Sequence, residues 1–412
     1  MVGRRVFLSQ GGLAAIGLSM VPGFLCRSLE AAEQGPRRKT LVVVFQRGGA
    51  DGLNMVVPFG EKSYYDHRPT IAIPQPGRGD DAALDLDGFF GLHPALGPLA
   101  PLYKAGHLGI IHAVGSPDTG DRSHFAAQDI MESAAPGLKT VSTGWLNRFL
   151  QGEPDPHATP LRATSIGEAL PKALRGSAPA VNIGRLDEFN LAGGSLYESM
   201  YSRESNALLT GAAHDMFAAM ELLKKVNPAK YQPGEGVNYG PPIDAFGQAL
   251  RQIAQLIKAD VGLQVAFIDV RGEWDTHQGQ TLRMTPLLQS FGRALAAFYR
   301  DLGTKMEDVV VLTMSEFGRT ARENGNAGTD HGHANVMFAM GGPIKGGKVY
   351  GRWPGLSPEQ LNEDRDLALT TDFRDVFAEV LVRHLQCNAT DKIFPRYPIA
   401  ASRFIGMLGA GI

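Results

Sequence analysis

The stretch Leu41-Val42-Val43-Val44-Phe45 decides the fold class of this chain. It is an unbroken apolar run of strand length, so it has no polar face to present to water. Strands of this kind lie inside parallel sheets, where helices cover both faces. Runs of the same character recur at residues 108–114, 264–270, 308–314 and 336–340. We therefore predict a mostly parallel sheet that contains these five segments.

Amphipathic segments alternate with the apolar runs. Residues 243–257 and 282–302 carry apolar side chains at helical spacing, and a third stripe runs from Phe373 to Leu385 behind the capping residue Asp372. This alternation predicts an α/β fold with a doubly wound sheet. We expect a single domain over residues 40–405. It has irregular insertions at about 60–100 and 185–240, the second with a helix near 212–225.

The composition excludes several classes of protein. The 412 residues include 40 Lys+Arg and 42 Asp+Glu, which gives a net charge of −2 and argues against a nucleic-acid partner. Two cysteines are too few for a disulfide scaffold or a cysteine-based zinc site.

The N-terminal segment is typical of an export signal. Arg4 and Arg5 precede Val6-Phe7-Leu8 and a Gly/Ala-rich apolar run, which resembles a twin-arginine signal peptide over residues 1–32. The run is too short for a secure membrane span. We expect cleavage near residues 31–32, with retention as an uncleaved anchor left open. The twin-arginine machinery would then be a partner, and the mature chain would be periplasmic or secreted, without a stable membrane span.

Residues that can perform chemistry gather in five loops. Ligands bind open α/β sheets at the edge where the parallel strands end, and we expect these loops to fall just after the C-terminal ends of such strands. The residues are Asp51, the group Arg122-Ser123-His124, the pair Asp275 and His277, the pair Glu316 and Arg319, and the group Asp330, His331 and His333.

These residue types favour a metal site beside a nucleophile. Carboxylates and imidazoles bind Zn, Mn or Fe. Ser123 precedes a predicted helix at 125–131, where free N–H groups favour an anion. His124 is a candidate ligand or proton donor. Simpler interpretations remain open: an Asp that closes its own turn, a Ser that caps a helix, and a His/Asp network that holds loops together.

Three familiar motifs do not apply. The segment 342–348 has P-loop spacing, but Val349 replaces the hydroxyl residue that would hold magnesium. Thr313 stands where a nucleophile elbow at Ser315 needs glycine. The Cys/Ser-x-Pro-x-Arg pattern from which sulfatases form formylglycine is absent.

Several motifs together resemble the bacterial domain-of-unknown-function family 1501, in order and over nearly all of residues 40–405. They are Gly48-Gly49-Ala50-Asp51-Gly52-Leu53-Asn54, Phe90-Gly91-Leu92-His93-Pro94-Ala95-Leu96, Arg122-Ser123-His124-Phe125-Ala126-Ala127-Gln128, Trp274-Asp275-Thr276-His277, Ser315-Glu316-Phe317-Gly318-Arg319-Thr320 and Gly328-Thr329-Asp330-His331-Gly332-His333-Ala334-Asn335. The family commonly carries twin-arginine signals and is grouped loosely with the alkaline phosphatase and sulfatase superfamily.

That resemblance implies an alkaline-phosphatase-like fold with a two-metal site. By motif, Asp51 is similar to the first-strand metal ligand and Ser123 to the nucleophile. The metal ligands implied are Asp51, Asp275, His277, Glu316, Asp330, His331 and His333. Two departures count against two metals: Asp275 and His277 are two apart instead of four, and Ser315-Glu316 stands where an Asp-His pair is expected.

We expect an exported hydrolase of phosphate or sulfate esters that uses a divalent metal (Zn, Mn or Ca). Ser123 would attack, His124 would assist, and Arg122 and Arg319 would contact the anionic group. The substrate would be a small-molecule or glycan ester. The alternative is a non-catalytic protein of the same fold that binds a glycan, an envelope polymer or a protein.

Overall fold

The computed structural model describes residues 38–118, 120–186, 218–224, 231–240 and 243–409. The predicted signal peptide and much of the 185–240 insertion lie outside these residues. Residues 218–224 are helical, as expected, and the rest of the predicted helix at 212–225 is not described. None of the described helices carries an apolar stretch long enough to cross a membrane.

Among the described residues, nine strands form one sheet in the order β11-β5-β10-β9-β1-β8-β6-β7, with β12 also paired to β5. All the pairings are parallel except those of β10. The predicted α/β class with a mostly parallel sheet is confirmed. The strands are β1 (Thr40–Gln46), β5 (Leu108–Gly115), β6 (Ala163–Ile166), β7 (Val181–Ile183), β8 (Val265–Val270), β9 (Val309–Ser315), β10 (Asn335–Gly341), β11 (Lys348–Tyr350) and β12 (Thr371–Asp372).

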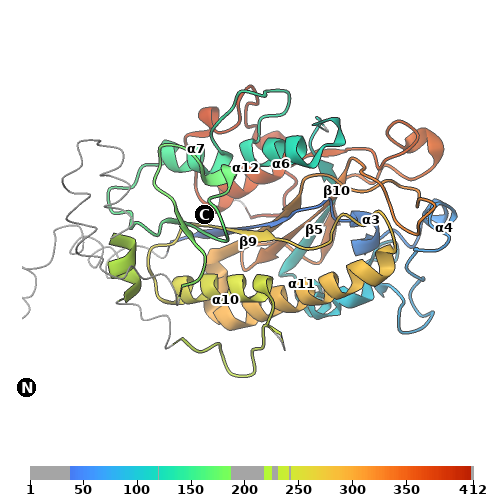
Figure 1. Cartoon of the computed structure of the whole chain (residues 1–412), viewed down its shortest axis with the longest axis horizontal. Helices are drawn as coiled ribbons and strands as arrows, with labels where there is room; N and C mark the ends of the chain where they lie inside the picture. The colour runs from blue at the N-terminus through green and yellow to red at the C-terminus, as the bar shows by residue number, and fades with distance from the viewer. Residues whose placement is uncertain (1–37, 119, 187–217, 225–230, 241–242, 410–412) are drawn as a thin grey trace, which may run out of the picture.

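Helices cover both faces of this sheet (Figure 1). One layer contains α6 (His124–Ser133), α7 (Trp145–Gly152) and α12 (Phe373–Glu379), and the other contains α10 (Ala245–Lys258) and α11 (Gln280–Leu302). Asp372 caps α12 through the N–H of Arg374, as its position predicts. The stripe beyond α12 continues as a π-helical turn, Val380–His384.

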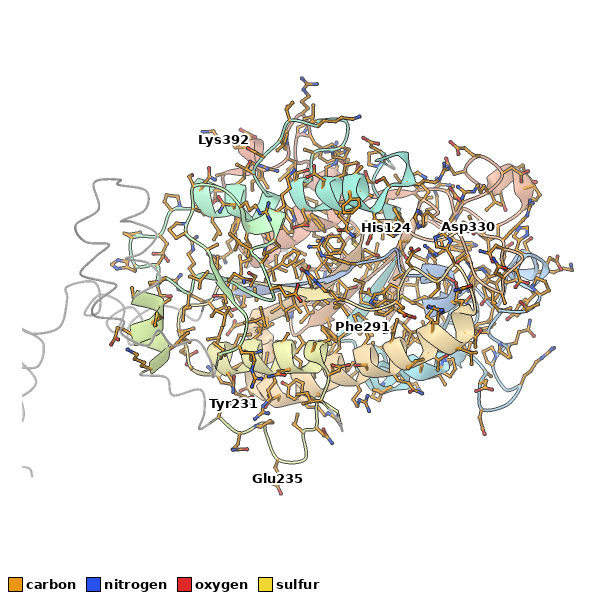
Figure 2. The ribbon with its side chains drawn as sticks, viewed as in Figure 1. His124, Tyr231, Glu235, Phe291, Asp330 and Lys392 are labelled. Carbon is orange, nitrogen blue, oxygen red and sulfur yellow. The ribbon has the colours of Figure 1, made fainter. Side chains whose placement is uncertain are left out.

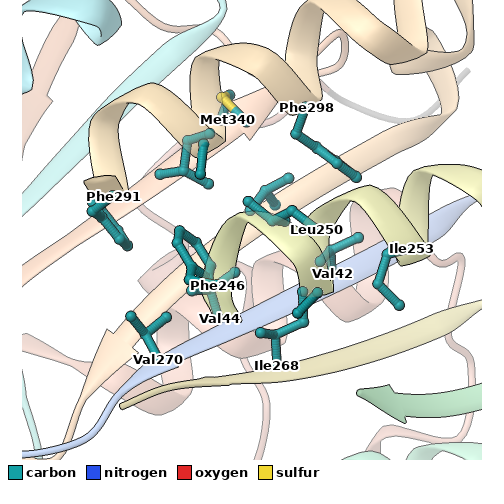
Figure 3. Packing of buried hydrophobic residues seen from close by; sticks show 14 of the residues in the cluster. Val42, Val44, Phe246, Leu250, Ile253, Ile268, Val270, Phe291, Phe298 and Met340 are labelled. Carbon is teal, nitrogen blue, oxygen red and sulfur yellow. The ribbon is translucent and has the colours of Figure 1, made fainter. Parts of the chain in front are cut away.

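Strand β1 explains why the apolar run has to be continuous. Its seven residues are all buried, and alternate side chains enter two separate cores. Val42 and Val44 pack with side chains of α10 and α11, such as Leu250 and Phe298 (Figure 3). Leu41, Val43 and Phe45 pack on the opposite face with α7 and α12. A polar residue anywhere in this run would be buried without a partner.

Strand β10 departs from the expected direction. The sequence predicts residues 336–340 as one more parallel strand, whereas β10 runs antiparallel to both β9 and β5. The connection from β9 contains no helix to carry the chain back across the sheet, so β10 can only return alongside β9. The start of β10 therefore lies at the edge where the parallel strands end.

The first insertion forms a small unit beside the sheet. It contains α4 (Lys62–His67), and β2 (Val56–Val57), β4 (Gly91–Leu92) and β3 (Leu84–Asp85) pair as a three-stranded antiparallel sheet. Two short helices, α3 (Gly52–Met55) and α5 (Ala100–Lys104), connect this unit to β1 and β5.

We expect acid to lower the stability of the folded protein because of the buried residue His112. Its Nε2 lies 3.1 Å from the Val56 carbonyl oxygen and its Nδ1 accepts the N–H of Ala113, an arrangement that requires the neutral ring. Burial lowers the pKa of His112 to about 4. Between this value and the unfolded pKa of about 6.5, only the unfolded chain takes up the proton. We therefore expect the free energy of unfolding to fall by roughly 1 kcal/mol per pH unit from this group as the pH drops.

Urea unfolding at pH 7, 6 and 5 measures this slope. His112→Gln should be less stable at pH 7 but should lose less stability on acidification, whereas exposed His157→Gln should behave like the parent. An unchanged slope in His112→Gln would contradict the assignment.

Candidate metal centre

Side chains from three loops meet at the edge of the sheet where the parallel strands end. His124 begins α6, Asp275 and His277 follow β8, and His331 precedes β10. Figure 2 labels His124 of this group and also Asp330, whose Oδ1 contacts Nδ1 of His277. We call His124, Asp275, His277 and His331 the three-histidine cluster.

The Nε2 atoms of the three rings surround the carboxylate of Asp275. Those of His277 and His331 each lie 3.1 Å from its Oδ1, and that of His124 lies 3.3 Å from its Oδ2. The ligand atoms of His124, Asp275 and His331 all fall within 4.8 Å of one another. His277 Nε2 lies 3.0 Å from His331 Nε2. The cluster is half-exposed, with 41% of the Asp275 side chain accessible, so a ligand can reach it.

The other nitrogen of each ring is held by an acceptor. Nδ1 of His124 lies 2.9 Å from Glu316 Oε1, and Nδ1 of His277 lies 2.8 Å from Asp330 Oδ1. Nδ1 of His331 lies 2.8 Å from the carbonyl oxygen of Arg122. These oxygens only accept, so in the neutral ring Nδ1 carries the hydrogen and Nε2 carries the lone pair. Metal-binding histidines in proteins are held in this way.

With all three rings neutral, the only positive charge at the centre of the cluster among the described residues would be that of Arg319, whose Nη1 lies 2.7 Å from Asp275 Oδ1. Three nitrogen lone pairs and a carboxylate point at one another, and acceptors at such distances repel unless a proton or a cation lies between them. The buried Nε2 of His124 has no well-aligned hydrogen-bond partner among the described residues. Contacts with Asp275, and then with Glu316, raise the pKa of His124 to about 9. This ring would then carry a proton at neutral pH when no metal is bound.

The surrounding carboxylates are held in the ionised form. Burial alone would raise the pKa of Asp275, but bonds from His124, His331 and Arg319 outweigh it and lower the pKa. Burial is likewise outweighed for Glu316, whose pKa is lowered by bonds from His124 and Gln128. Burial would also raise the pKa of Asp330, but hydrogen bonds from His277 and Asn324 outweigh it and lower the pKa. Ionised carboxylates behind the rings increase their basicity as ligands.

Two glycines allow the late loop to reach the cluster. A Cβ atom on Gly328 would lie 2.3 Å from the carbonyl carbon of His277, and one on Gly332 would lie 2.4 Å from that of Arg319. No other residue fits at these contacts. The ring of Phe317 lies under His331, with 4.8 Å between centroids, and limits its rotation.

The chain matches the profile of a family described as "Protein of unknown function (DUF1501)" over residues 111–393. It belongs to this family. The matched residues include all of the three-histidine cluster. No curated protein matches the sequence.

Two solved structures are similar to this DUF1501 chain. One is the C-terminal periplasmic domain of EcEptC from Escherichia coli in complex with Zn, at 8% identity and a TM-score of 0.37, covering 74% of this chain and 73% of that one. The other is the PsFucS1 sulfatase from Pseudoalteromonas sp., at 12% identity and a TM-score of 0.37, and the match covers 95% of this chain and 75% of the sulfatase chain. At this level of similarity they say nothing about the substrate.

The structure brings together some of the residues expected at the site. Asp275, His277 and His331 point into the cluster, and His124 joins them in the position of a ligand. Glu316 and Asp330, expected as ligands themselves, lie behind the rings of His124 and His277. Glu316 is fully buried and accepts the N–H of Gly48 and the amide of Gln128, so it faces away from the centre.

Asp51 does not reach the cluster, contrary to the expectation of a first-strand ligand. Both of its oxygens bind the guanidinium of Arg68, and they also accept the N–H of Leu53 and the amide of Gln280. Both Asp51 and Arg68 have side chains that are 0% exposed. Each oxygen already accepts two hydrogen bonds, so no lone pair of this carboxylate faces a metal, and the arginine balances its charge.

His333 and Arg122 also point elsewhere. Nε2 of His333 contacts the Ser116 carbonyl oxygen at 2.8 Å. The Arg122 side chain forms ion pairs with Asp366 and Glu363, and only its carbonyl oxygen touches the cluster, through His331. Arg122 has a φ of 56°, an uncommon conformation for a residue other than glycine. Its contribution is to orient an imidazole.

Ser123 directly precedes His124 of the cluster in the sequence. It is exposed, it precedes His124 as the N-cap of α6, and its side chain makes no capping bond to that helix. The next residue, Phe125, is 89% exposed. The hydroxyl is thus accessible, whereas its neighbour His124 points toward Asp275 and Glu316 and cannot act as its base.

Sequence reasoning missed the residues that support the cluster. Phe317, Arg68, Gln280 and Thr329 are buried and carry no motif of their own. The available signals were Phe317 inside Ser-Glu-Phe-Gly-Arg and Thr329 inside Gly-Thr-Asp-His-Gly-His, both beside residues already singled out.

Proposed function

We propose that this protein is an exported hydrolase that binds one divalent metal ion at the three-histidine cluster and cleaves phosphate or sulfate esters. The observation that carries the proposal is the convergence of three imidazole Nε2 atoms on the Asp275 carboxylate, with every Nδ1 held by an acceptor. When the three rings are neutral, as they are when they bind a metal, their Nε2 lone pairs all face inward.

The donor atoms fit some metals better than others. Three nitrogens and a carboxylate suit zinc, manganese or iron. Calcium, which the sequence analysis included among the expected metals, takes six to eight oxygen ligands. It therefore does not suit three nitrogens and one carboxylate. With Asp51 paired to Arg68, the described residues support one metal ion instead of two. A bound metal would polarise the ester and stabilise the negative charge that develops on its oxygens.

The remaining roles belong to the chain itself. The exposed Ser123 hydroxyl is the group that would attack the phosphorus or sulfur atom. The bond to the alcohol would break as the seryl ester forms, and the alcohol would leave with the hydroxyl proton. Water would then hydrolyse the seryl ester to phosphate or sulfate and free Ser123, while N–H groups in the first turn of α6 would hold the oxygens of the transferred group. Arg319 was expected to contact the substrate, but its side chain is 0% exposed and its Nη1 lies 2.7 Å from Asp275 Oδ1. It therefore acts on the substrate only through Asp275.

One observation favours the alternative of a non-catalytic binding protein. Arg319 already gives Asp275 a positive partner, so the carboxylate is not isolated when no metal is bound. Elemental analysis of the purified mature chain separates the two functions. Stoichiometric metal supports the hydrolase, and a folded chain without metal supports the binder of a glycan, an envelope polymer or a protein.

The first residues support an exported location for this hydrolase. Arg4 and Arg5 before the Phe7-Leu8 pair support export through the twin-arginine machinery, which carries folded cargo. The protein would then act in the periplasm or outside the cell on a small-molecule or glycan ester.

An ester assay tests the reaction. The mature chain loaded with zinc or manganese should cleave an aryl phosphate or aryl sulfate, and a chelator should stop it. Ser123→Ala should lower kcat by roughly 10³-fold or more, as removal of covalent nucleophiles does elsewhere. Ser116, like Ser123, lies between β5 and α6. The variant Ser116→Ala is therefore the matched control, and it should retain activity. Full activity in Ser123→Ala would remove the serine from the mechanism.

A further inference from the structure

A chain of buried polar side chains connects the Asp51–Arg68 ion pair with the three-histidine cluster. It runs from Asp51 through Gln280 and Thr329 to Arg319. These four residues are between 0% and 1% exposed. Buried polar groups cost free energy unless each has a partner, so an unbroken chain of this kind holds its members in fixed orientations.

The first connection fixes Gln280. Its Nε2 donates to Oδ2 of Asp51, so its Oε1 must point the other way. There it accepts the hydroxyls of Thr276 (2.8 Å) and Thr329 (2.7 Å). Because Asp51 is a carboxylate that only accepts, the reverse orientation of the amide would place two acceptors together. Asp51 therefore decides which way Gln280 points.

The second connection fixes Arg319. The hydroxyl hydrogen of Thr329 is used toward Gln280, which leaves the oxygen to accept Nε of Arg319 at 3.2 Å. Nη2 of Arg319 donates to the Thr329 carbonyl oxygen at 2.6 Å. The planar guanidinium is thus held on one side by Thr329, and its Nη1 points at Oδ1 of Asp275, 2.7 Å away.

We propose that Asp51, Gln280 and Thr329 are positioning residues that set the metal affinity of the three-histidine cluster by fixing Arg319 against Asp275. The inference rests on the proposed metal site. Asp275 lies in a loop, and its carboxylate could rotate away from the rings. Arg319 donates to Oδ1, which also lies 3.1 Å from Nε2 of His277 and of His331, while Oδ2 stays beside His124 Nε2. Carboxylate ligands need such a partner, and loss of outer-shell partners typically costs 10–100-fold in metal affinity.

Thr329→Val tests this relay, because it removes the hydroxyl and keeps the shape. We expect the zinc dissociation constant, measured by competition with a chromogenic chelator, to rise by about 10-fold. The visible spectrum of the Co²⁺ form should change as well. Thr329→Ser keeps the hydroxyl and should restore both. Thr40→Val loses a buried hydroxyl bond to the Leu263 carbonyl far from the cluster, and it should lower stability without moving either readout.

Gln280→Met is the second variant if Thr329→Val does not fold, and the same rise in dissociation constant is expected. Either variant, folded and binding zinc as tightly as the parent, would overturn the relay and leave the metal site in place. A parent chain that binds no zinc, manganese or iron would instead overturn the proposed function, and the relay with it.

Discussion

Replacing His331 by glutamine is expected to weaken zinc binding by more than about 100-fold, because loss of an outer-shell partner alone costs 10–100-fold. The ring supplies one of the three inward Nε2 atoms and contacts both Asp275 and His277. The same variant should lose metal-dependent ester cleavage. Chelator competition measures the affinity, and elemental analysis measures the metal retained after purification.

His333→Gln is the matched control, since it changes the same residue type two positions away. Its Nε2 faces the Ser116 carbonyl oxygen and lies outside the cluster. Zinc affinity should therefore stay at the parental value. Equal losses in the two variants would show that the late loop acts as a whole and that His331 is not a specific ligand.

Asp51→Ala is expected to lower the free energy of unfolding by about 3–5 kcal/mol, the usual cost of leaving a buried charge unpaired. Arg68 would keep its positive charge with no carboxylate beside it, in a region where both side chains are 0% exposed. The free energy of unfolding should fall by the same amount with and without a chelator, because the loss comes from the ion pair and not from a metal. Urea unfolding of the metal-free protein measures it.

Asp66→Ala provides the comparison for this effect. Asp66 pairs with Lys62 at the surface, with 54% of its side chain exposed, and surface pairs contribute about 0–1 kcal/mol. If Asp51→Ala were as stable as Asp66→Ala without metal, and lost stability only in the metal-loaded form, Asp51 would stabilise the protein through the metal and not through its ion pair with Arg68.

The sheet could be predicted because its strands are buried on both faces. Each of the five predicted runs corresponds to an observed strand within one or two residues, from β1 to β10. Continuous burial demands continuous apolar sequence, and no other element of this length makes that demand. The direction of β10 could not be predicted from its own residues, because direction depends on the connection before it.

The candidate site was predicted in part. Asp275, His277 and His331 stand in short Gly-containing loops beside strand ends, and such loops converge at one edge of the sheet. Asp51 has the same local setting but a different partner. Its motif does not reveal that Arg68, 17 residues later, returns to bind both of its oxygens.

The sequence alone determined the fold class and the set of polar groups at one edge of the sheet, because hydrophobic periodicity and loop position are local properties of the chain. Only the tertiary structure decided which of these groups face one another. A carboxylate pairs with whichever cation packing brings within about 3 Å, and an imidazole shows its lone pair on the side opposite its nearest acceptor. Those neighbours come from segments up to 268 residues apart, as in the bond from Gly48 to Glu316, and no local pattern records them.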